Sequence, residues 1–381
     1  EVTVNAKDKT DISLVWSGYI SKTKRNIYST LELTEFTSTS IKLDNIRDFT
    51  RLNFSVTDKY GNRSVVTYDI YVADSGITRI SGDDRYQTSM KIADELKTKL
   101  GVDKFDAVVL ACGTNFPDAL AGSYLAYVKN APILLTTEKY AGKNEYETIN
   151  AYIKANLKSG GTIYVLGGPA AVNENCLKGL NGFTVKRLGG DDRIKTNLLI
   201  LQEAGVSDED ILVCTGWNYA DSLSASAAKL PILLVGNKLT DEQKKYLRNL
   251  KSKNFYVIGG TGAVKEDVFN ELKAYGNVTR VMGSTRHETS VEIAKKFFKD
   301  VDGAVIAYSY NFPDGLCGGP LAASMDVPLL LVRANNEVDA AEYLLVAPLM
   351  KKYALGGVNA LSNATIRTVF LLTDTDGILV K

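Results

Sequence analysis

The sequence predicts three repeated α/β domains, each built on a parallel sheet, after a smaller all-β domain. A motif that begins with arginine occurs three times, as RISGDDRYQTS from Arg79, RLGGDDRIKTN from Arg187 and RVMGSTRHETS from Arg280. After each copy, short apolar runs alternate with helical patterns, as expected for parallel strands covered by helices on both faces. The copies lie about 100 residues apart, which is the size of a whole domain. Three near-equal domains suggest a pseudo-threefold cluster.

Length and composition are consistent with several soluble domains. A chain of 381 residues exceeds the size at which one hydrophobic core keeps growing. With 45% hydrophobic and 23% charged residues it is typical of globular proteins, and no apolar run approaches the roughly 18–20 residues of a membrane helix. No charged-then-apolar leader follows the first residue, so we expect a processed protein or a fragment. The repeats divide the chain into residues 1–76, 77–186, 187–279 and 280–381.

The first segment, residues 1–76, has the pattern of a small β-sandwich. ISLVWSGYI, IYSTLEL, RLNFSVT and SVVTYDIYV are β-branched and aromatic runs with partial alternation, and DKYGN at 58–62 supplies a turn between the last two. NFSVTDKYGNRSVVTYDIYV resembles the closing hairpin of Ig-like modules in bacterial surface proteins. Such sandwiches usually need about 100 residues. We therefore expect a small or truncated Ig-like domain.

The first α/β repeat shows the expected alternation most clearly. Met90, Ala93, Leu96 and Leu100 have helical spacing, and Gly101 is a plausible C-cap, so a helix is predicted over 88–101. The elements expected after it are strand 107–111, helix 119–128, strand 131–136, helix 145–157, strand 162–168, helix 173–180 and strand 183–188. The same order recurs in the second and third repeats, where PILLV and PLLLV match APILLT, and YVIGG and YALGG match YVLGG.

Arginine is the residue type that marks equivalent positions. Nine arginines follow residue 76, and six of them occupy two places in the motif. The planar guanidinium has five donors and suits bidentate recognition of carboxylate or phosphate, which lysine does not imitate. The candidate contacts to a carboxylate or phosphate group of a ligand are therefore Arg79, Arg187 and Arg280 at the start of the motif, and Arg85, Arg193 and Arg286 six residues later.

A second recurring set follows a buried strand in each repeat, at the mouth of a helix. Asparagine or aspartate there caps the helix, and loops that leave the carboxyl ends of parallel strands form the usual ligand crevice. The residues expected to shape or brace the site are Asn115, Asp118, Asn218, Asp221, Asn311 and Asp314. An alternative stays open: Arg85 with Asp118, and their counterparts, form three internal ion pairs that lock loop to loop within each repeat.

Other residue types exclude several classes of site. The four cysteines, Cys112, Cys176, Cys214 and Cys317, contain no C-x-x-C spacing and fall at unlike places in the repeats, so we expect buried thiols and no zinc framework. His287 is the only histidine, which excludes a repeated histidine triad. The GG pairs that begin at Gly167, Gly259 and Gly356 predict tight strand-to-helix turns, since no further phosphate-loop motif follows them.

The acidic pair in GDDR raises an enzymatic alternative. Asp83 and Asp84, with Asp118, could hold Mg²⁺ in a phosphoryl- or nucleotide-handling enzyme. The third copy has Ser284 and Thr285 at the positions of the acidic pair, yet keeps the arginine that follows. A triplicated metal enzyme is therefore disfavoured, and no metal or cofactor is expected. One or two active copies stay open as the alternative.

Together, RISGDDRYQTS, NFPDALA, APILLT and YVLGG resemble the type 2 cell-wall-binding module, which occurs as triplets in surface-layer and cell-wall proteins of clostridia such as Clostridioides difficile. The resemblance covers residues 79–381. It implies Toprim-like, Rossmann-like modules packed as a pseudo-threefold triangle, which hold the protein non-covalently to an anionic cell-wall polysaccharide. The implied place is extracellular, in the wall or S-layer of a Gram-positive bacterium, with other S-layer proteins as further partners. No catalysis, nucleic acid or membrane is implied.

Two expectations follow for the parts of the chain. Three tethered contacts to a repeating polymer share a high effective concentration, which raises avidity by about 10²–10⁴. The third repeat departs most from the motif and carries one more acidic than basic residue, so we expect it to contribute least to polymer binding. The β domain is expected to act as a spacer, an adhesin or the remnant of an effector.

Overall fold

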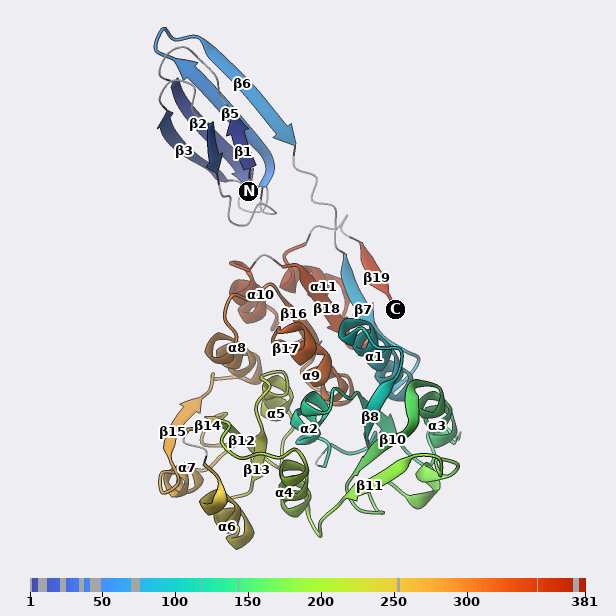
Figure 1. Cartoon of the computed structure of the whole chain (residues 1–381). Coiled ribbons are helices and arrows are strands. Elements are labelled where there is room, and N and C mark those ends of the chain that lie inside the picture. Colours follow the sequence, from blue (N-terminus) through green and yellow to red (C-terminus); the bar gives the residue numbers. More distant parts are fainter. Residues whose placement is uncertain are drawn as a thin grey trace. The chain divides into compact units, whose positions relative to one another are not determined.

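The chain forms two compact units in the computed structural model (Figure 1). One contains residues 1–75 with 346–348, and the other contains residues 76–345 and 349–381. The residues that the structure describes are 2–5, 12–20, 25–33, 38–41, 49–69, 76–116, 118–142, 144–251, 254–347, 349–372 and 377–381.

The first unit is all-β, as predicted. A four-stranded antiparallel sheet has the order β3 (Arg25–Leu33), β2 (Ile12–Ile20), β5 (Phe49–Asp58) and β6 (Arg63–Asp69), and a second sheet pairs β1 (Val2–Asn5) with β4 (Ser38–Ile41). The predicted turn between β5 and β6 is confirmed: the Asp58 carboxylate accepts from the backbone N–H of Tyr60 and Asn62, and Gly61 has φ +87°. The Ig-like assignment of this unit stays a prediction.

The second unit contains three parallel sheets, which confirms the predicted fold class. We call each sheet, with its covering helices, a module. In module 1 the strands follow the order β11 (Thr184–Leu188), β10 (Leu157–Leu166), β8 (Phe105–Cys112) and β9 (Ile133–Thr136). Module 2 has β13 (Ile232–Val235), β12 (Ile211–Thr215), β14 (Asn254–Ile258) and β15 (Asn277–Val281). Module 3 has β17 (Leu329–Val332), β16 (Gly303–Tyr308), β18 (Lys351–Leu355), β7 (Ile77–Ile80) and β19 (Ile378–Val380).

The helices follow the predicted order. Module 1 has α1 (Arg85–Leu100), α2 (Gly122–Val128), α3 (Glu145–Asn156) and a short 3₁₀ turn (Glu174–Leu177) in place of the predicted helix at 173–180. Module 2 has α4 (Arg193–Glu203), α5 (Ala220–Ala225), α6 (Asp241–Asn249) and α7 (Glu266–Leu272). Module 3 has α8 (Arg286–Phe297), α9 (Pro313–Met325), α10 (Val338–Leu344) and α11 (Asn363–Val369). The predicted C-cap of the first helix is confirmed, because Gly101 is left-handed there.

Each arginine motif spans two modules. Its strand completes the sheet of one module and its helix begins the next, so the predicted divisions at 186/187 and 279/280 fall inside β11 and β15. The first motif follows the same rule in a ring. Its strand, β7, pairs with β18 and β19 of module 3, with Leu355 opposite Ile80. The chain therefore closes on itself, since the first strand of the second unit belongs to the last module.

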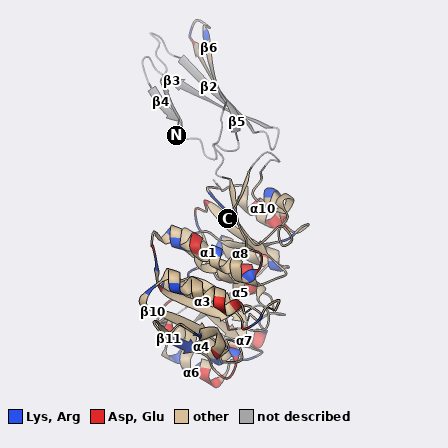
Figure 2. Cartoon of the chain, turned by 90° about the vertical axis from the view of Figure 1, so that its right-hand side faces the viewer, with Lys and Arg blue, Asp and Glu red and all other residues tan. Residues whose placement is uncertain are grey.

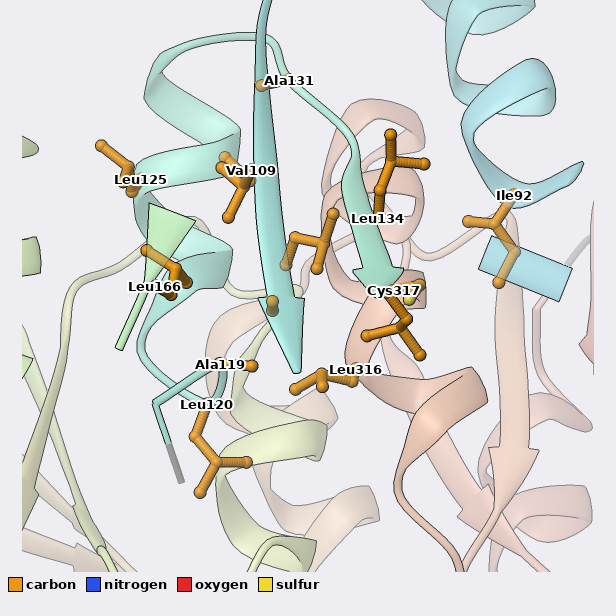
Figure 3. Close-up of a cluster of buried hydrophobic side chains, with 14 of the residues drawn as sticks. Ile92, Val109, Ala119, Leu120, Leu125, Ala131, Leu134, Leu166, Leu316 and Cys317 are labelled. Atoms are coloured by element: carbon orange, nitrogen blue, oxygen red, sulfur yellow. The ribbon is translucent and has the colours of Figure 1, made fainter. Parts of the chain in front are cut away.

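The modules pack against one another through their helices. Contacts join α2 to α4, α5 to α8 and α9 to α1, and α2 and α5 also pack against α9, near the middle of the unit in Figure 1. One cluster of buried side chains includes residues from all three modules. Figure 3 shows part of it, with Leu316 of α9 near Ala119 and Cys317 of α9 near Leu134, both partners belonging to module 1. All four cysteines are buried and free, as predicted.

The approach of α9 to α5 depends on a glycine. A Cβ atom at Gly319 would lie 2.4 Å from the Ser226 hydroxyl oxygen and 2.7 Å from its Cβ. A glycine in the middle of a helix normally costs about 0.5–1 kcal/mol relative to alanine. Its presence in α9 is therefore explained by the close contact between modules 2 and 3.

We expect Gly319→Ala to destabilise the second unit by about 1–3 kcal/mol, because overpacking at Ser226 outweighs the gain in helix propensity. Gly357→Ala is the control, since a Cβ atom added at Gly357 would have no other atom within 4 Å. Urea unfolding followed by circular dichroism measures both variants. A Gly319→Ala protein that is as stable as the wild type would show that the modules do not approach as closely as described.

Candidate functional site

Three aromatic rings meet where the modules converge. They belong to the loops that follow β8, β12 and β16, in the motifs NFPD, NYAD and NFPD. The ring centroids of Phe116, Tyr219 and Phe312 are 5.5, 5.6 and 6.0 Å apart, with one ring from each module. We call these three residues the axial triad. Their mutual contacts place the pseudo-threefold axis between the loops at the carboxyl ends of the sheets. The sequence held the signal for this triad, since an aromatic residue recurs between the asparagine and the aspartate.

The second arginine of each motif lies beside these loops. Each begins a helix, is half-buried, and donates one N–H to a loop carbonyl that follows the central strand of its own module. Nη1 of Arg85 lies 2.6 Å from the Gly113 oxygen, Nη1 of Arg193 lies 2.7 Å from that of Gly216, and Nη1 of Arg286 lies 2.7 Å from that of Ser309. These bonds hold the three guanidinium groups at equivalent places around the axis.

The same three arginines lie over aromatic rings that differ between modules. Arg85 is 5.8 Å from the ring centroid of Phe312 and 5.9 Å from that of Tyr140. Arg193 lies 4.3 Å from the exposed ring of Trp217. Arg286 lies 4.5 Å from Tyr310 and 5.8 Å from Tyr219. Contacts at these distances are worth about 0.5–2 kcal/mol and fix the guanidinium planes without neutralising their charge.

The recurring aspartates lie beneath the loops, and their charges face the next module. Burial raises the pKa of Asp221 and of Asp314 to about 6 each, and it also raises the pKa of Asp118. The charge that opposes this rise is Arg286 for Asp221 and Arg85 for Asp314. For Asp118 the opposing groups are a hydrogen bond from Thr196 and the charge of Arg193, both in module 2.

The alternative of ion pairs within each repeat is therefore wrong about the partners. Each aspartate interacts electrostatically with the arginine of the following motif, Asp118 with Arg193, Asp221 with Arg286 and Asp314 with Arg85. In the part of the chain that is described, none of these pairs is close enough for a direct ion pair. The charges thus interact across the module boundaries, at longer range.

Each aspartate also explains the GG turn of its own module. Gly167, Gly259 and Gly356 have φ near +90°, which favours glycine. A Cβ atom at these positions would lie 2.3 Å from Asp118 Oδ2, 2.3 Å from Asp221 Oδ2 and 2.4 Å from Asp314 Oδ2, respectively. The predicted tight turn is confirmed, and the glycine also leaves room for the carboxylate that lies over it.

The first arginine of each motif braces this turn from the other side. Arg79 donates to the Gly356 oxygen at 2.6 Å, and Arg187 and Arg280 donate to the Gly167 and Gly259 oxygens at 3.0 and 2.9 Å. Arg79 is 1% exposed and also donates to the Leu361 oxygen, which places it inside the fold. The other two are partly exposed and form ion pairs on the surface, Arg187 with Glu174 and Arg280 with Glu266.

The three asparagines shape the loops and are exposed. The side-chain oxygens of Asn115 and Asn311 accept from the next backbone N–H at 3.0 Å, and that of Asn218 accepts from Ala220 N–H at 3.2 Å. They do not contact the recurring arginines. Their expected part in shaping the site stays a prediction.

The second aspartate of each GDDR motif caps a helix. The Asp84 carboxylate caps α1, the Asp192 carboxylate caps α4, and the Thr285 hydroxyl caps α8. Asp83 is exposed, and no group of three or more histidine, cysteine, aspartate or glutamate side chains in the described ranges is arranged to hold a metal ion. Since threonine also caps helices, the change from GDDR to GSTR in module 3 keeps this function.

Acidic and basic residues are interspersed along α1, α3, α4 and α8 in the view of Figure 2. None of the helices in the described part of the chain combines the length and the apolar character that crossing a membrane requires.

Comparisons with known proteins agree on one family. The model of the family described as cell wall binding domain 2 matches residues 79–177, 187–269 and 280–366. The chain is 26% identical over 293 residues to the N-acetylmuramoyl-L-alanine amidase LytC of Bacillus subtilis, covering 75% of this chain and 56% of that protein. It is 29% identical over 269 residues to the amidase enhancer of the same organism, covering 69% of this chain and 36% of the relative.

Two solved structures share the fold. Cwp8 from Clostridium difficile matches with a TM-score of 0.67 and 24% identity, over 85% of this chain and 59% of that one. Cwp6 from Clostridium difficile matches with a TM-score of 0.68 and 18% identity, over 98% of this chain and 66% of that one. The chain therefore spans between about a third and two thirds of the length of these four proteins.

The raised pKa values of Asp221 and Asp314 predict a stability that increases as the pH falls. In the folded state the pKa of both carboxyls lies above the ordinary value of 3.8, so they bind a proton more tightly than in the unfolded chain. Protonation of these carboxyls therefore stabilises the fold as the pH falls from about 7 to about 4. From pH 7 to pH 5 we expect a gain of about 1 kcal/mol for each aspartate.

Urea unfolding at the two pH values, compared with Asp221→Asn and with the exposed control Asp191→Asn, measures this gain. Asp221→Asn should reduce the pH dependence, because an amide is neutral at both values, whereas Asp191→Asn should keep it. An Asp221→Asn variant with the same pH dependence as the wild type would contradict the burial of Asp221 described here.

Proposed function

Because the chain belongs to the cell wall binding domain 2 family, we propose that modules 1–3 attach it non-covalently to an anionic secondary polysaccharide of a Gram-positive cell wall. The chain carries three cell-wall-binding repeats, and its place is the cell wall. The negative charge of the polymer is part of the proposal. Other surface-layer proteins are proposed as neighbours in the wall.

The observation that supports an anionic polymer is that Arg85, Arg193 and Arg286 make the same hydrogen bond in each module and keep their other donors free of protein acceptors among the described residues. Each guanidinium has five donors and gives one to a loop carbonyl. The remaining donors of the three groups meet no protein acceptor among the described residues. Such groups, fixed in orientation and still charged, suit carboxylate or phosphate.

Three contacts in one rigid arrangement suit a repeating polymer. A single exposed contact between an arginine and an anionic sugar is weak in water. When three contacts are tethered in one unit, the second and third form at high effective concentration, and avidity increases by about 10²–10⁴. The contacts across the module boundaries keep the spacing between the three arginines constant.

We also propose that this part of the chain acts by binding and not by catalysis. The capping function of Asp84 and Asp192 supports this view, because it accounts for the acidic pair without a metal. LytC is named as an amidase, but the chain covers only 56% of it. The first, all-β unit is then a spacer, an adhesin or an effector remnant.

Replacing Arg85, Arg193 and Arg286 together with glutamine should reduce binding to purified clostridial cell walls at least tenfold, because three tethered contacts are lost at once. Co-sedimentation across a salt series measures this binding. Wild-type binding should weaken with salt and disappear when mild acid has removed the secondary polysaccharide from the walls.

The matched control removes the same positive charge from the opposite end of the sheets. Lys104, Arg248 and Lys251 are exposed and lie before β8, at the end of α6 and before β14. Their triple replacement with glutamine should bind like the wild type. Equal losses in both triple variants, with both folded by circular dichroism, would contradict a specific site, and equal binding of the wild type to stripped walls would contradict the polymer.

A further inference from the structure

Module 3 carries an arginine that the other two modules lack. Arg333 is the first residue after β17, where module 2 has Gly236 after β13 and module 1 has Thr137 after β9. Its guanidinium lies 4.7 Å from the ring centroid of Tyr310, and that of Arg286 lies 4.5 Å from the same centroid. Two positive charges are therefore held against a single, partly exposed tyrosine ring.

In the described ranges, no acidic side chain lies within ion-pair distance of Arg333 or Arg286, and the guanidinium of Arg333 donates no hydrogen bond to the protein. The positive charge of both arginines also acts on the buried His287. Burial lowers its pKa, and the charges of Arg286 and Arg333 lower it further, whereas Asp339 and Glu288 raise it. Bringing two like charges together costs free energy that a bound anion would offset.

A cavity of about 350 Å³ opens beside Arg333, at the carboxyl end of the module 3 sheet. Among the described residues that line it, Arg333 is the only charged one. The polar groups around it are those of Tyr308, Asn359, Ser362 and Thr365, and Val358 adds an apolar wall. The volume lies at the lower end of the range of small-molecule sites, which is about 300–1,000 Å³.

The acidic residues of module 3 gather elsewhere. A separate cavity of about 470 Å³ is lined by Glu288, Glu292, Asp339 and Glu342, with Lys295 beside them. The two cavities share no lining residue. These acidic side chains therefore do not line the cavity beside Arg333.

We propose that the cavity beside Arg333 is a subsite for one anionic saccharide unit, with its phosphate or carboxylate bound by Arg333. This subsite rests on the proposed wall-binding function. It assigns one anionic group of the polymer to module 3, since modules 1 and 2 have no arginine at the position of Arg333. It reverses the expectation that the third repeat contributes least to binding. Arg333 presents the charge, and Asn359 and Ser362, both exposed, offer polar groups to sugar hydroxyls.

Isothermal titration of the full chain with glucose 6-phosphate, glucuronate and glucose tests the subsite. We expect binding of at least one charged sugar and no binding of glucose. The charged sugar that binds identifies the anionic group as phosphate or carboxylate. Arg333→Gln should weaken its binding at least tenfold, whereas Arg248→Gln, on α6, should leave it unchanged. No binding of either charged sugar at tens of millimolar, or equal binding of glucose, would overturn the proposal.

A second variant leaves the arginine in place. Asn359→Asp puts a carboxylate on an exposed loop at the cavity and should also weaken binding of the charged sugar. Unchanged affinity in both Arg333→Gln and Asn359→Asp would overturn the subsite. Wall co-sedimentation separates the two proposals. If the walls retain the wild type and Arg333→Gln equally and no sugar binds, the subsite alone is overturned. If the walls do not retain the wild type, the anchoring function is overturned.

Discussion

The second unit depends on the way each GG turn is held between two neighbouring modules. The turn of one module lies beneath its own aspartate, and the first arginine of the next motif donates to its carbonyl. The second arginine of that motif faces the same aspartate. The first arginine of a motif therefore serves the preceding module. The second links two modules, because it donates to a loop carbonyl of its own module and interacts with the aspartate of the preceding one. This shared use of one motif joins the modules more specifically than apolar contact alone.

This arrangement explains why the repeats form a closed set. The turns of modules 1 and 2 receive their arginines from the motifs that follow them in the chain. Module 3 has no later motif, and its Gly356 is braced by Arg79, from the start of the unit. The strand that carries Arg79 also completes the module 3 sheet. A module removed from the ring would lack the groups that hold its turn and would expose the helix faces that its neighbours cover.

The recurrence of the motif made much of this predictable. Comparing the copies identified the parallel sheets, the six arginines, the GG turns and the aspartates, because residues that repeat at equal positions share a structural task. The partners of the aspartates were not predictable in the same way. Spacing within a repeat suggests that Arg85 meets Asp118, whereas the sheet to which a strand belongs is decided by packing of distant segments. The pairing of β7 with β18 joins residues that are far apart in the sequence.

The groups around the axis then divide into a constant framework and a variable lining. Arginine, aspartate and glycine recur in every module because the ring needs them for its closure. The residue before each recurring asparagine is Thr114, Trp217 or Tyr310, and only the last has a second arginine beside it. Comparison between copies cannot find a residue such as Arg333, since it occurs once. Under the proposed function, a repeating polymer that meets this ring would find three similar cationic positions in three different chemical surroundings, so we expect its affinity to arise from the framework and its selectivity from the lining.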